Sequence, residues 1–229
     1  MKHKCLMLSL ILLPVILFAV LRGRVYERRT KALVGAVEKK NHRLAQTLIN
    51  QGANVNTKSK SGENLLMVAA YQGDWQTAVA LEKAGAKADI NTRLFVATVK
   101  GDTNAVAKLL SSGANPNAKD KDGDAVLVYA VSYERLPIVK LLIAKGADVN
   151  AKNKKGVTVL MCAAGCDRAE AVRMLLEHGA DVHAKDNAGQ TVINHRSTLL
   201  PIGGNPNPEL TLKLLKQAGA KWGKVKGAM

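Results

Sequence analysis

The dipeptide Gly-Ala recurs along the chain at intervals near 33 residues, and this recurrence constrains the fold more than any other feature. Three of the five intervals are 33 residues, one is shorter at 28, and one is longer at 40. A period in this range is typical of stacked supersecondary units, none of which can bury its apolar face alone. The sequence therefore predicts an all-α repeat solenoid of about six units. The dipeptides begin at Gly52, Gly85, Gly113, Gly146, Gly179 and Gly219.

Each period contains the same parts in the same order. An amphipathic apolar run precedes Gly-Ala, a polar run rich in Asn and Lys follows it, and a turn glycine and a short apolar, Ala-containing run complete the period. Glycine after an apolar run is suited to a helix end with positive φ, and clustered Asn, Asp and Gly favour turns. Each unit is thus expected to be two short antiparallel helices and a β-hairpin finger.

The unit resembles the ankyrin repeat. The ankyrin signature Thr-Pro-Leu-His-x-Ala corresponds here to Asn-Leu-Leu-Met-Val-Ala at 64–69 and Thr-Val-Leu-Met-Cys-Ala at 158–163. Replacement of Pro and His is expected to remove a stiff turn and a side-chain hydrogen bond but to keep the apolar face. The resemblance covers residues 31–222 and implies about six ankyrin-like helix-turn-helix units with β-hairpin fingers, which form a protein-binding module without enzymatic activity.

Two units depart from the period. Five residues are missing between Gly85 and Gly113, so the finger is nearly absent there, and we expect a notch beside Tyr71 that a partner peptide or loop could enter. Seven residues are added between Gly179 and Gly219. The Gly, Pro and Asn cluster at 201–208 is expected to form an exposed loop, which is either a tolerated insertion or a contact loop.

The first 30 residues read as a signal peptide or an N-terminal membrane anchor with a basic flank. The apolar run at 5–21 has a length between those typical of a signal peptide and of a membrane span, and no convincing cleavage site follows it, which favours an anchor. The excess of arginine after the run favours a cytoplasmic body, whereas the short Lys-rich start favours export to the periplasm or beyond. Both locations stay open. The repeat domain then spans 31–222, and 223–229 is a basic tail.

The chain is strongly basic and poor in aromatic residues. It has 34 Lys and Arg against 18 Asp and Glu, a formal net charge of +16, and 3% aromatic residues. The basic residues recur in each repeat, which is typical either of a solvated face or of a surface for an acidic protein or membrane phosphates. Nucleic acid is not expected as a partner because no basic groove with aromatic residues is present, and a monomeric solenoid is expected. The recurring lysines after the Asn positions are Lys58, Lys119, Lys152 and Lys185.

Four residues approach the spacing of a two-Cys, two-His zinc site, namely Cys162, Cys166, His178 and His183. Their phase in the repeat argues against metal. Cys162 is expected to face the core from the first helix of its unit, and Cys166 to lie at the turn between helices, so a buried small hydrophobic role is the default. His178 closes a helix and His183 belongs to the next finger.

No arrangement of residues indicates catalysis or a cofactor. Asp120, Asp122 and Asp124 alternate as in a calcium loop, but no bidentate Glu follows at the required place. The chain has no hydrolase elbow, phosphate loop or dinucleotide fingerprint. We therefore expect no catalytic residue, no cofactor and no metal.

The resemblance also implies where a partner binds. In ankyrin-like proteins the contact surface is the concave face, which is built from finger tips and the exposed ends of the first helices. Exposed Tyr and Trp are typical contact anchors, whereas Tyr129 is expected in the core. The positions that match this surface are Lys60, Ser61, Glu63, Tyr71, Gln72, Trp75, Lys121, Asp122, Asp124, Ser132, Tyr133, Lys154, Lys155 and Val157.

These observations predict a module that binds an acidic protein partner in the cell envelope. Small bacterial exported ankyrin proteins, which the chain resembles, imply a role in stabilising or inhibiting an enzyme or toxin. The alternative is a membrane-surface adaptor or scaffold that grips anionic lipids through its basic N-terminal flank. The arginines of that flank are Arg22, Arg24, Arg28 and Arg29.

Overall fold

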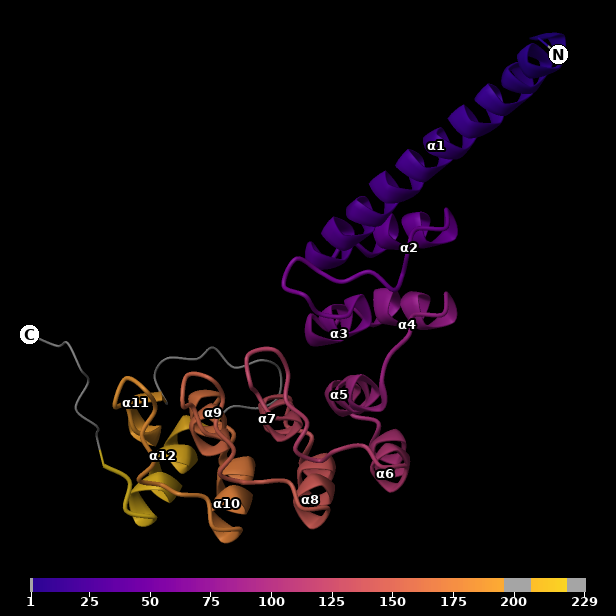
Figure 1. The fold of residues 1–229 in the computed structure, drawn as a ribbon. Helices are drawn as coiled ribbons and strands as arrows, with labels where there is room; N and C mark the ends of the chain where they lie inside the picture. Colours follow the sequence, from indigo (N-terminus) through magenta and orange to yellow (C-terminus); the bar gives the residue numbers. More distant parts are fainter. Residues whose placement is uncertain (1, 196–206, 222–229) are drawn as a thin grey trace, which may run out of the picture. The chain divides into compact units, whose positions relative to one another are not determined.

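The computed structural model describes residues 2–195 and 207–221, with side chains from residue 20 onward except that of Trp75. Twelve α-helices in these residues form six consecutive pairs, which we number repeats 1 to 6 (Figure 1). The predicted all-α repeat architecture of about six units is confirmed. The inserted cluster at 201–208 lies outside the described residues up to position 206, and the tail at 223–229 lies outside them entirely.

The chain divides into two compact bodies, Met1–Ala88 and Asp89–Met229. The N-terminal body contains α1 (Lys2–Glu38), α2 (His42–Asn50), α3 (Leu65–Tyr71) and α4 (Trp75–Lys83). Helices α1 and α3 pack together and so do α2 and α4, so repeats 1 and 2 stack as two layers of helices. Only the last turns of α1 belong to repeat 1, because its buried residues there are Leu33, Ala36 and Val37.

The C-terminal body contains repeats 3 to 6 and has the same two layers. The first helices α5, α7, α9 and α11 pack in order, and so do the second helices α6, α8, α10 and α12 (Figure 1). Its core consists mostly of Leu, Val, Ile and Ala, as the low aromatic content predicts. The helices are α5 (Ile90–Lys100), α6 (Thr103–Ser111), α7 (Val126–Ser132), α8 (Leu136–Ala144), α9 (Val159–Gly165), α10 (Ala169–Glu177), α11 (Val192–His195) and α12 (Pro208–Gln217).

The recurring Gly-Ala ends the second helix of every repeat, as predicted. All six glycines have φ between 79° and 92°, a conformation in which a side chain would be strained. The following amide turns back to the helix, as in the 2.9 Å bond that Ala147 N donates to Leu142 O. This geometry closes the helix and sends the chain into the finger.

The predicted fingers are present as short antiparallel turns. We name them finger 2 (53–64), finger 4 (114–125), finger 5 (147–158) and finger 6 (180–191), after the repeat that each precedes. Single antiparallel bridges close the first three, at Lys58 and Asn64, Lys119 and Ala125, and Lys152 and Thr158. Repeat 3 lacks a finger, as expected, because α5 begins directly after its cap residue Asp89.

The signature segment of repeat 5 has a side-chain hydrogen bond where replacement of His was expected to remove one. Thr158 caps α9 by accepting a 3.2 Å bond from Met161 N, and the Met161 sulfur accepts from Thr158 N at 3.4 Å. The expectation that replacing His removes a side-chain hydrogen bond is therefore wrong for this repeat. The thioether is a weak acceptor, but it lies where it can reach the capping amide.

The second helices begin in two different ways. Four of them have an Asn or Asp cap whose side chain accepts a backbone N–H, as when Asp102 accepts from Ala105 N at 3.0 Å. In repeats 4 and 5 the cap positions hold arginine instead. Arg135 Nη2 donates to Val99 O at 3.2 Å, and Arg168 Nε donates to Ser132 O at 3.3 Å. These two side chains thus join each repeat to the one before it.

Candidate functional site

The tips of fingers 4, 5 and 6 form one continuous edge. Lys154 N donates to Asp122 O at 3.0 Å, and Asn187 N donates to Lys155 O at 3.0 Å. Each tip is thereby attached to the next through its backbone, while the side chains of Lys121, Lys154 and Lys155 stay exposed. The edge is therefore formed before any partner arrives.

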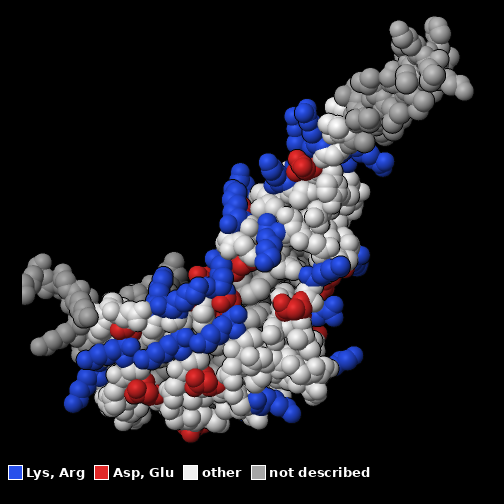
Figure 2. Space-filling view, viewed as in Figure 1, with Lys and Arg blue, Asp and Glu red and all other residues white. Residues whose placement is uncertain are grey.

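The same fingers also carry a row of lysines that extends from one repeat to the next. Lys119 Nζ donates to Lys152 O at 3.0 Å, and Lys152 Nζ donates to Lys185 O at 3.4 Å. We name Lys119, Lys152 and Lys185 the lysine row. All three are exposed, and none forms an ion pair with a residue that the structure describes. Figure 2 shows basic side chains running as a band across this part of the molecule.

The three alternating aspartates of finger 4 have three different roles. Asp120 Oδ1 accepts from Asp122 N at 2.9 Å and from Asp124 N at 2.8 Å, so it shapes the turn. Asp124 accepts from Asn153 Nδ2 at 2.9 Å in the neighbouring finger. Burial raises the pKa of the Asp124 carboxyl, and the negative charges of Asp120 and Asp122 raise it further. The hydrogen bond from Asn153 lowers this pKa but does not cancel the increase. Asp122 is exposed and pairs with Lys121 at 3.4 Å.

The contact candidates on α7 lie partly inside the body. Ser132 is buried, and its carbonyl accepts from Arg168. Tyr133 is half-buried, and burial raises the pKa of its hydroxyl despite the opposing charge of Arg135. Tyr129 was expected in the core but is half-buried: its ring meets Phe95 edge-on at 5.4 Å, and its hydroxyl donates to Asp120.

The tip of finger 2 is attached to the end of α1. Lys60 Nζ lies 3.5 Å from Glu38 Oε2, and Lys60 N donates to Glu38 Oε1 at 3.0 Å. Ser61 Oγ donates to Glu63 Oε2 at 2.8 Å. The Lys60 side chain is nevertheless 83% exposed, so this tip also presents a basic group to solvent.

The remaining candidates of the N-terminal body are less exposed. Tyr71 is half-buried, and Gln72 Nε2 donates to Glu38 O at 3.1 Å, so the Gln72 amide joins α3 to the end of α1. The side chain of Trp75 lies outside those described. The notch expected beside Tyr71 results from the residues missing between Gly85 and Gly113, a segment in which the first body ends and the second begins. The notch therefore stays a prediction.

The structure thus brings together the predicted tip residues of neighbouring fingers but directs Gln72, Asp124 and Ser132 toward contacts within the protein. The half-buried Val157 belongs to finger 5, where its amide donates to Asn153 Oδ1 at 3.0 Å. Sequence reasoning noticed the recurring lysines but did not include the lysine row among the contact residues. Their 33-residue spacing was the available signal, because equal phase places them at equal positions in stacked repeats.

The two cysteines are buried, as predicted. Cys162 lies on α9, and Cys166 is the residue that caps the end of this helix. Burial raises the pKa of the Cys162 thiol to about 12, with smaller contributions from Asp124 and Cys166, so this thiol is protonated and unreactive at neutral pH. His178 follows α10, and His183 lies exposed on finger 6. The described residues contain no group of three or more His, Cys, Asp or Glu arranged to hold a metal ion.

Finger 6 makes a buried side-chain contact with α11. Asp186 takes the position of Asp120, and its Oδ1 accepts from the amides of Ala188 and Gln190. Its Oδ2 lies 2.9 Å from His195 Nε2, with both side chains at most 10% exposed. Burial raises the pKa of the Asp186 carboxyl, but the bonds from His195, Gln190 and Ala188 outweigh burial and hold it below its usual value.

This lowered pKa predicts an acid-sensitive finger. A carboxyl with a lowered folded-state pKa contributes stability above about pH 4, which is lost as the pH falls through the folded-state value. We expect Asp186→Asn to lower the free energy of unfolding by about 1–2 kcal/mol at pH 6, and this difference should be smaller at pH 3. At the equivalent position of finger 5, the Asn153 side chain accepts from Lys155 N. An asparagine side chain can therefore form this turn, and the variant should keep it. Urea unfolding at both pH values measures this, and a difference independent of pH would contradict it.

Two further findings concern the helices and the family of the chain. In the part of the chain with described side chains, no helix is long and apolar enough to cross a membrane, and the apolar run 5–21 lies almost wholly outside that part. The sequence matches the family model described as ankyrin repeats in three copies, over residues 33–120 and 94–186. The two matches overlap and together cover more than half of the chain.

Proposed function

The chain belongs to the ankyrin-repeat family, and from this premise we propose that its C-terminal body binds an acidic protein partner along fingers 4 to 6. Ankyrin repeats are generally protein–protein interaction modules and typically have no enzymatic activity. The observation that supports this surface is the lysine row, whose three ammonium groups are exposed and unpaired with any described carboxylate. Such a row is complementary to a surface with repeated carboxylates.

The backbone bonds between the finger tips support the same proposal. A surface that is already ordered loses little conformational entropy on binding, so more of the contact energy appears as affinity. The tip residues Lys121, Lys154 and Lys155 then extend the basic area beyond the lysine row. Because these charges are exposed, the association should be fast and should weaken as salt increases.

The place of binding is part of the proposal. The N-terminal segment 1–30 would attach the repeats to a membrane through 5–21, or direct them across it, so that the partner is met in the cell envelope. A basic, preformed surface held there is suited to stabilising or restraining an acidic enzyme or toxin. The lysine row would supply the electrostatic attraction in either case.

The test compares two triple variants of equal charge. Lys119→Gln/Lys152→Gln/Lys185→Gln should weaken partner binding at low salt by about tenfold or more and reduce its salt dependence. The control Lys108→Gln/Lys140→Gln/Lys145→Gln changes three exposed lysines on or next to α6 and α8 and should retain the affinity. The partner is first recovered with tagged full-length protein from membrane and soluble envelope fractions, and affinity is then measured at two salt concentrations.

Two outcomes would contradict the proposal. Equal weakening by both triple variants would show that net charge alone matters, without a contribution from finger position. Recovery of lipid with no stoichiometric protein would favour the alternative, a membrane-surface adaptor. The intact mass of the recovered chain reports in the same experiment whether residues 1–21 remain.

A further inference from the structure

The part of α1 that precedes repeat 1 carries an unusual concentration of exposed apolar side chains. Val20, Leu21, Val25 and Tyr26 are 43–51% exposed, and they are four of the six large exposed apolar residues among the described side chains. Single exposed apolar residues are ordinary, but a cluster of them on a soluble surface indicates contact with something else.

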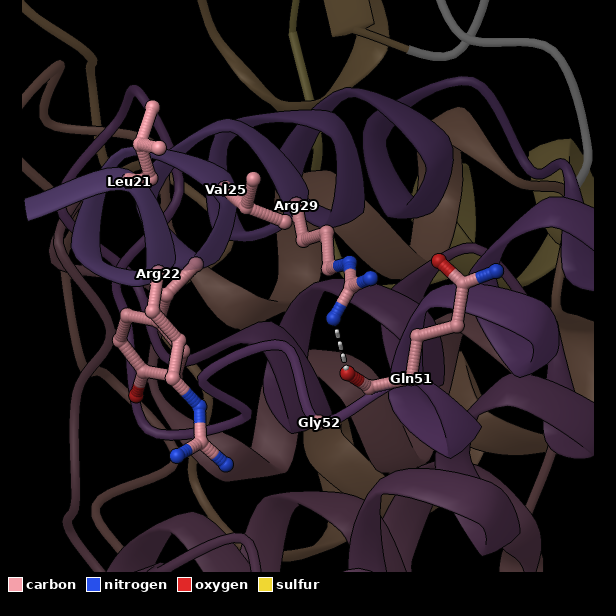
Figure 3. Close-up of a pocket in the computed structure, with 7 residues that line it drawn as sticks. Leu21, Arg22, Val25, Arg29, Gln51 and Gly52 are labelled. Atoms are coloured by element: carbon pink, nitrogen blue, oxygen red, sulfur yellow. Dashed lines mark hydrogen bonds between the residues drawn. The ribbon is translucent and has the colours of Figure 1, made fainter. Parts of the chain in front are cut away.

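A pocket of about 580 Å³ lies beside this cluster, between α1 and the turn that follows α2. Arg22, Tyr26 and Arg29 are spaced by four and three residues, so they share one face of the helix. Figure 3 shows the Arg22 and Arg29 side chains extending from α1, and the Arg29 guanidinium directed at Gln51. The lining residues are Leu21, Arg22, Val25, Tyr26, Arg29, Gln51 and Gly52.

The pocket is positively charged, and no carboxylate lines it. Arg29 Nη1 donates to Gln51 O at 2.9 Å, which fixes the guanidinium at the pocket and leaves further N–H groups for a ligand. Arg22 has no hydrogen bond or ion pair with any described residue. Two guanidinium groups with free donors beside apolar side chains match a ligand that is anionic at one end and apolar at the other.

We propose that this pocket binds the phosphate of an anionic phospholipid. Arg22 and Arg29 donate to the phosphate oxygens, while Leu21, Val25 and Tyr26 contact the glycerol and the first acyl carbons. The chain itself indicates a membrane as the source of this ligand, because α1 continues toward its N-terminus into the apolar run 5–21. Tyr and Arg directly beside an apolar segment are typical of the membrane–water interface.

The inference rests on the proposed attachment of the chain to a membrane, and the two can be tested separately. Sedimentation of the full chain with vesicles of phosphatidylcholine alone tests the attachment, because this lipid has no net charge. The headgroup site is tested in neutral detergent, where no vesicle is present. Native mass spectrometry of the full chain with equimolar phosphatidylglycerol and phosphatidylcholine gives the ratio of the two bound lipids. Both lipids carry the phosphate, but the cationic choline of phosphatidylcholine is repelled by the two arginines, so the site should prefer phosphatidylglycerol.

A charge-matched pair of variants identifies the pocket. Arg22→Gln/Arg29→Gln removes two arginines from the pocket face, and Arg24→Gln/Arg28→Gln removes two from other faces of α1. Diffuse attraction to anionic lipid changes by roughly fivefold per basic residue and would affect both variants equally. We expect the pocket variant to lose at least tenfold more of the preference for phosphatidylglycerol than the control.

Because Arg29 also holds Gln51, the single variants Arg22→Gln and Arg24→Gln provide a comparison in which no described contact within the protein is lost. The first should reduce the preference more than the second, with thermal unfolding midpoints unchanged. Equal loss in the paired variants, or no preference in the unaltered chain, would overturn the proposal. Binding of inorganic phosphate as strongly as phosphatidylglycerol would overturn the assignment to lipid.

Discussion

Replacing Arg168 with alanine is expected to lower the free energy of unfolding of the C-terminal body by about 3 kcal/mol. Arg168 is 1% exposed as a residue, and its side chain is the largest fully buried side chain described. Its Nε donates to Ser132 O at 3.3 Å, and its Nη1 lies 3.6 Å from Glu134 Oε2. The substitution removes these contacts, leaves a cavity, and takes a positive charge away from the partly buried Glu134. Urea unfolding followed by circular dichroism measures the effect.

The control for this prediction is Arg135→Ala. Arg135 holds the same position one repeat earlier and likewise donates to a carbonyl of the preceding repeat, that of Val99. It is only half-buried and has no described carboxylate at ion-pair distance, so its removal should cost about 1 kcal/mol. Equal losses for the two variants would show that burial and the Glu134 contact add nothing at Arg168.

Those two arginines also mark the limit of what the sequence could predict. Signals within a few residues predict where the second helices end, where the fingers form and which repeat lacks a finger. They can do so because positive φ and turn formation are local properties. Arginine is not a helix-capping residue, and the bonds of Arg135 and Arg168 reach carbonyls 36 residues earlier. No local pattern specifies such a contact, since it exists only once the repeats are stacked.

The candidate surface divides in the same way. Repeat phase correctly placed the tip residues Lys121, Lys154 and Lys155 on exposed finger tips, since stacked repeats put equal positions side by side. Phase did not determine the direction of each side chain. Ser132 is turned into the body and Asp124 toward Asn153 because packing between neighbouring repeats, rather than spacing, decides which polar groups find a partner. The headgroup pocket depends on Gln51 and Gly52, which lie far from the arginines in sequence.

The second large effect is expected at the contact between fingers 5 and 6. Gly156 has φ of 77°, and a Cβ there would lie 2.9 Å from the backbone nitrogen of Asn187. Alanine therefore meets both a strained conformation and a backbone atom that cannot move without shifting finger 6. We expect Gly156→Ala to cost about 2–3 kcal/mol, of which roughly 1–2 kcal/mol is conformational. Gly146→Ala supplies the control, because Gly146 has φ of 86° but no atom within 4 Å of a Cβ.

The difference between these two alanine variants connects the fold to the proposed function. Gly156→Ala should weaken the 3.0 Å bond from Asn187 N to Lys155 O, so hydrogen exchange of the Asn187 amide should accelerate in this variant and stay unchanged in Gly146→Ala. If the partner binds a preformed edge, Gly156→Ala should also lose affinity, since binding would then have to restore the order of finger 6. Faster exchange without any loss of affinity would mean that the partner does not use the contact between these fingers.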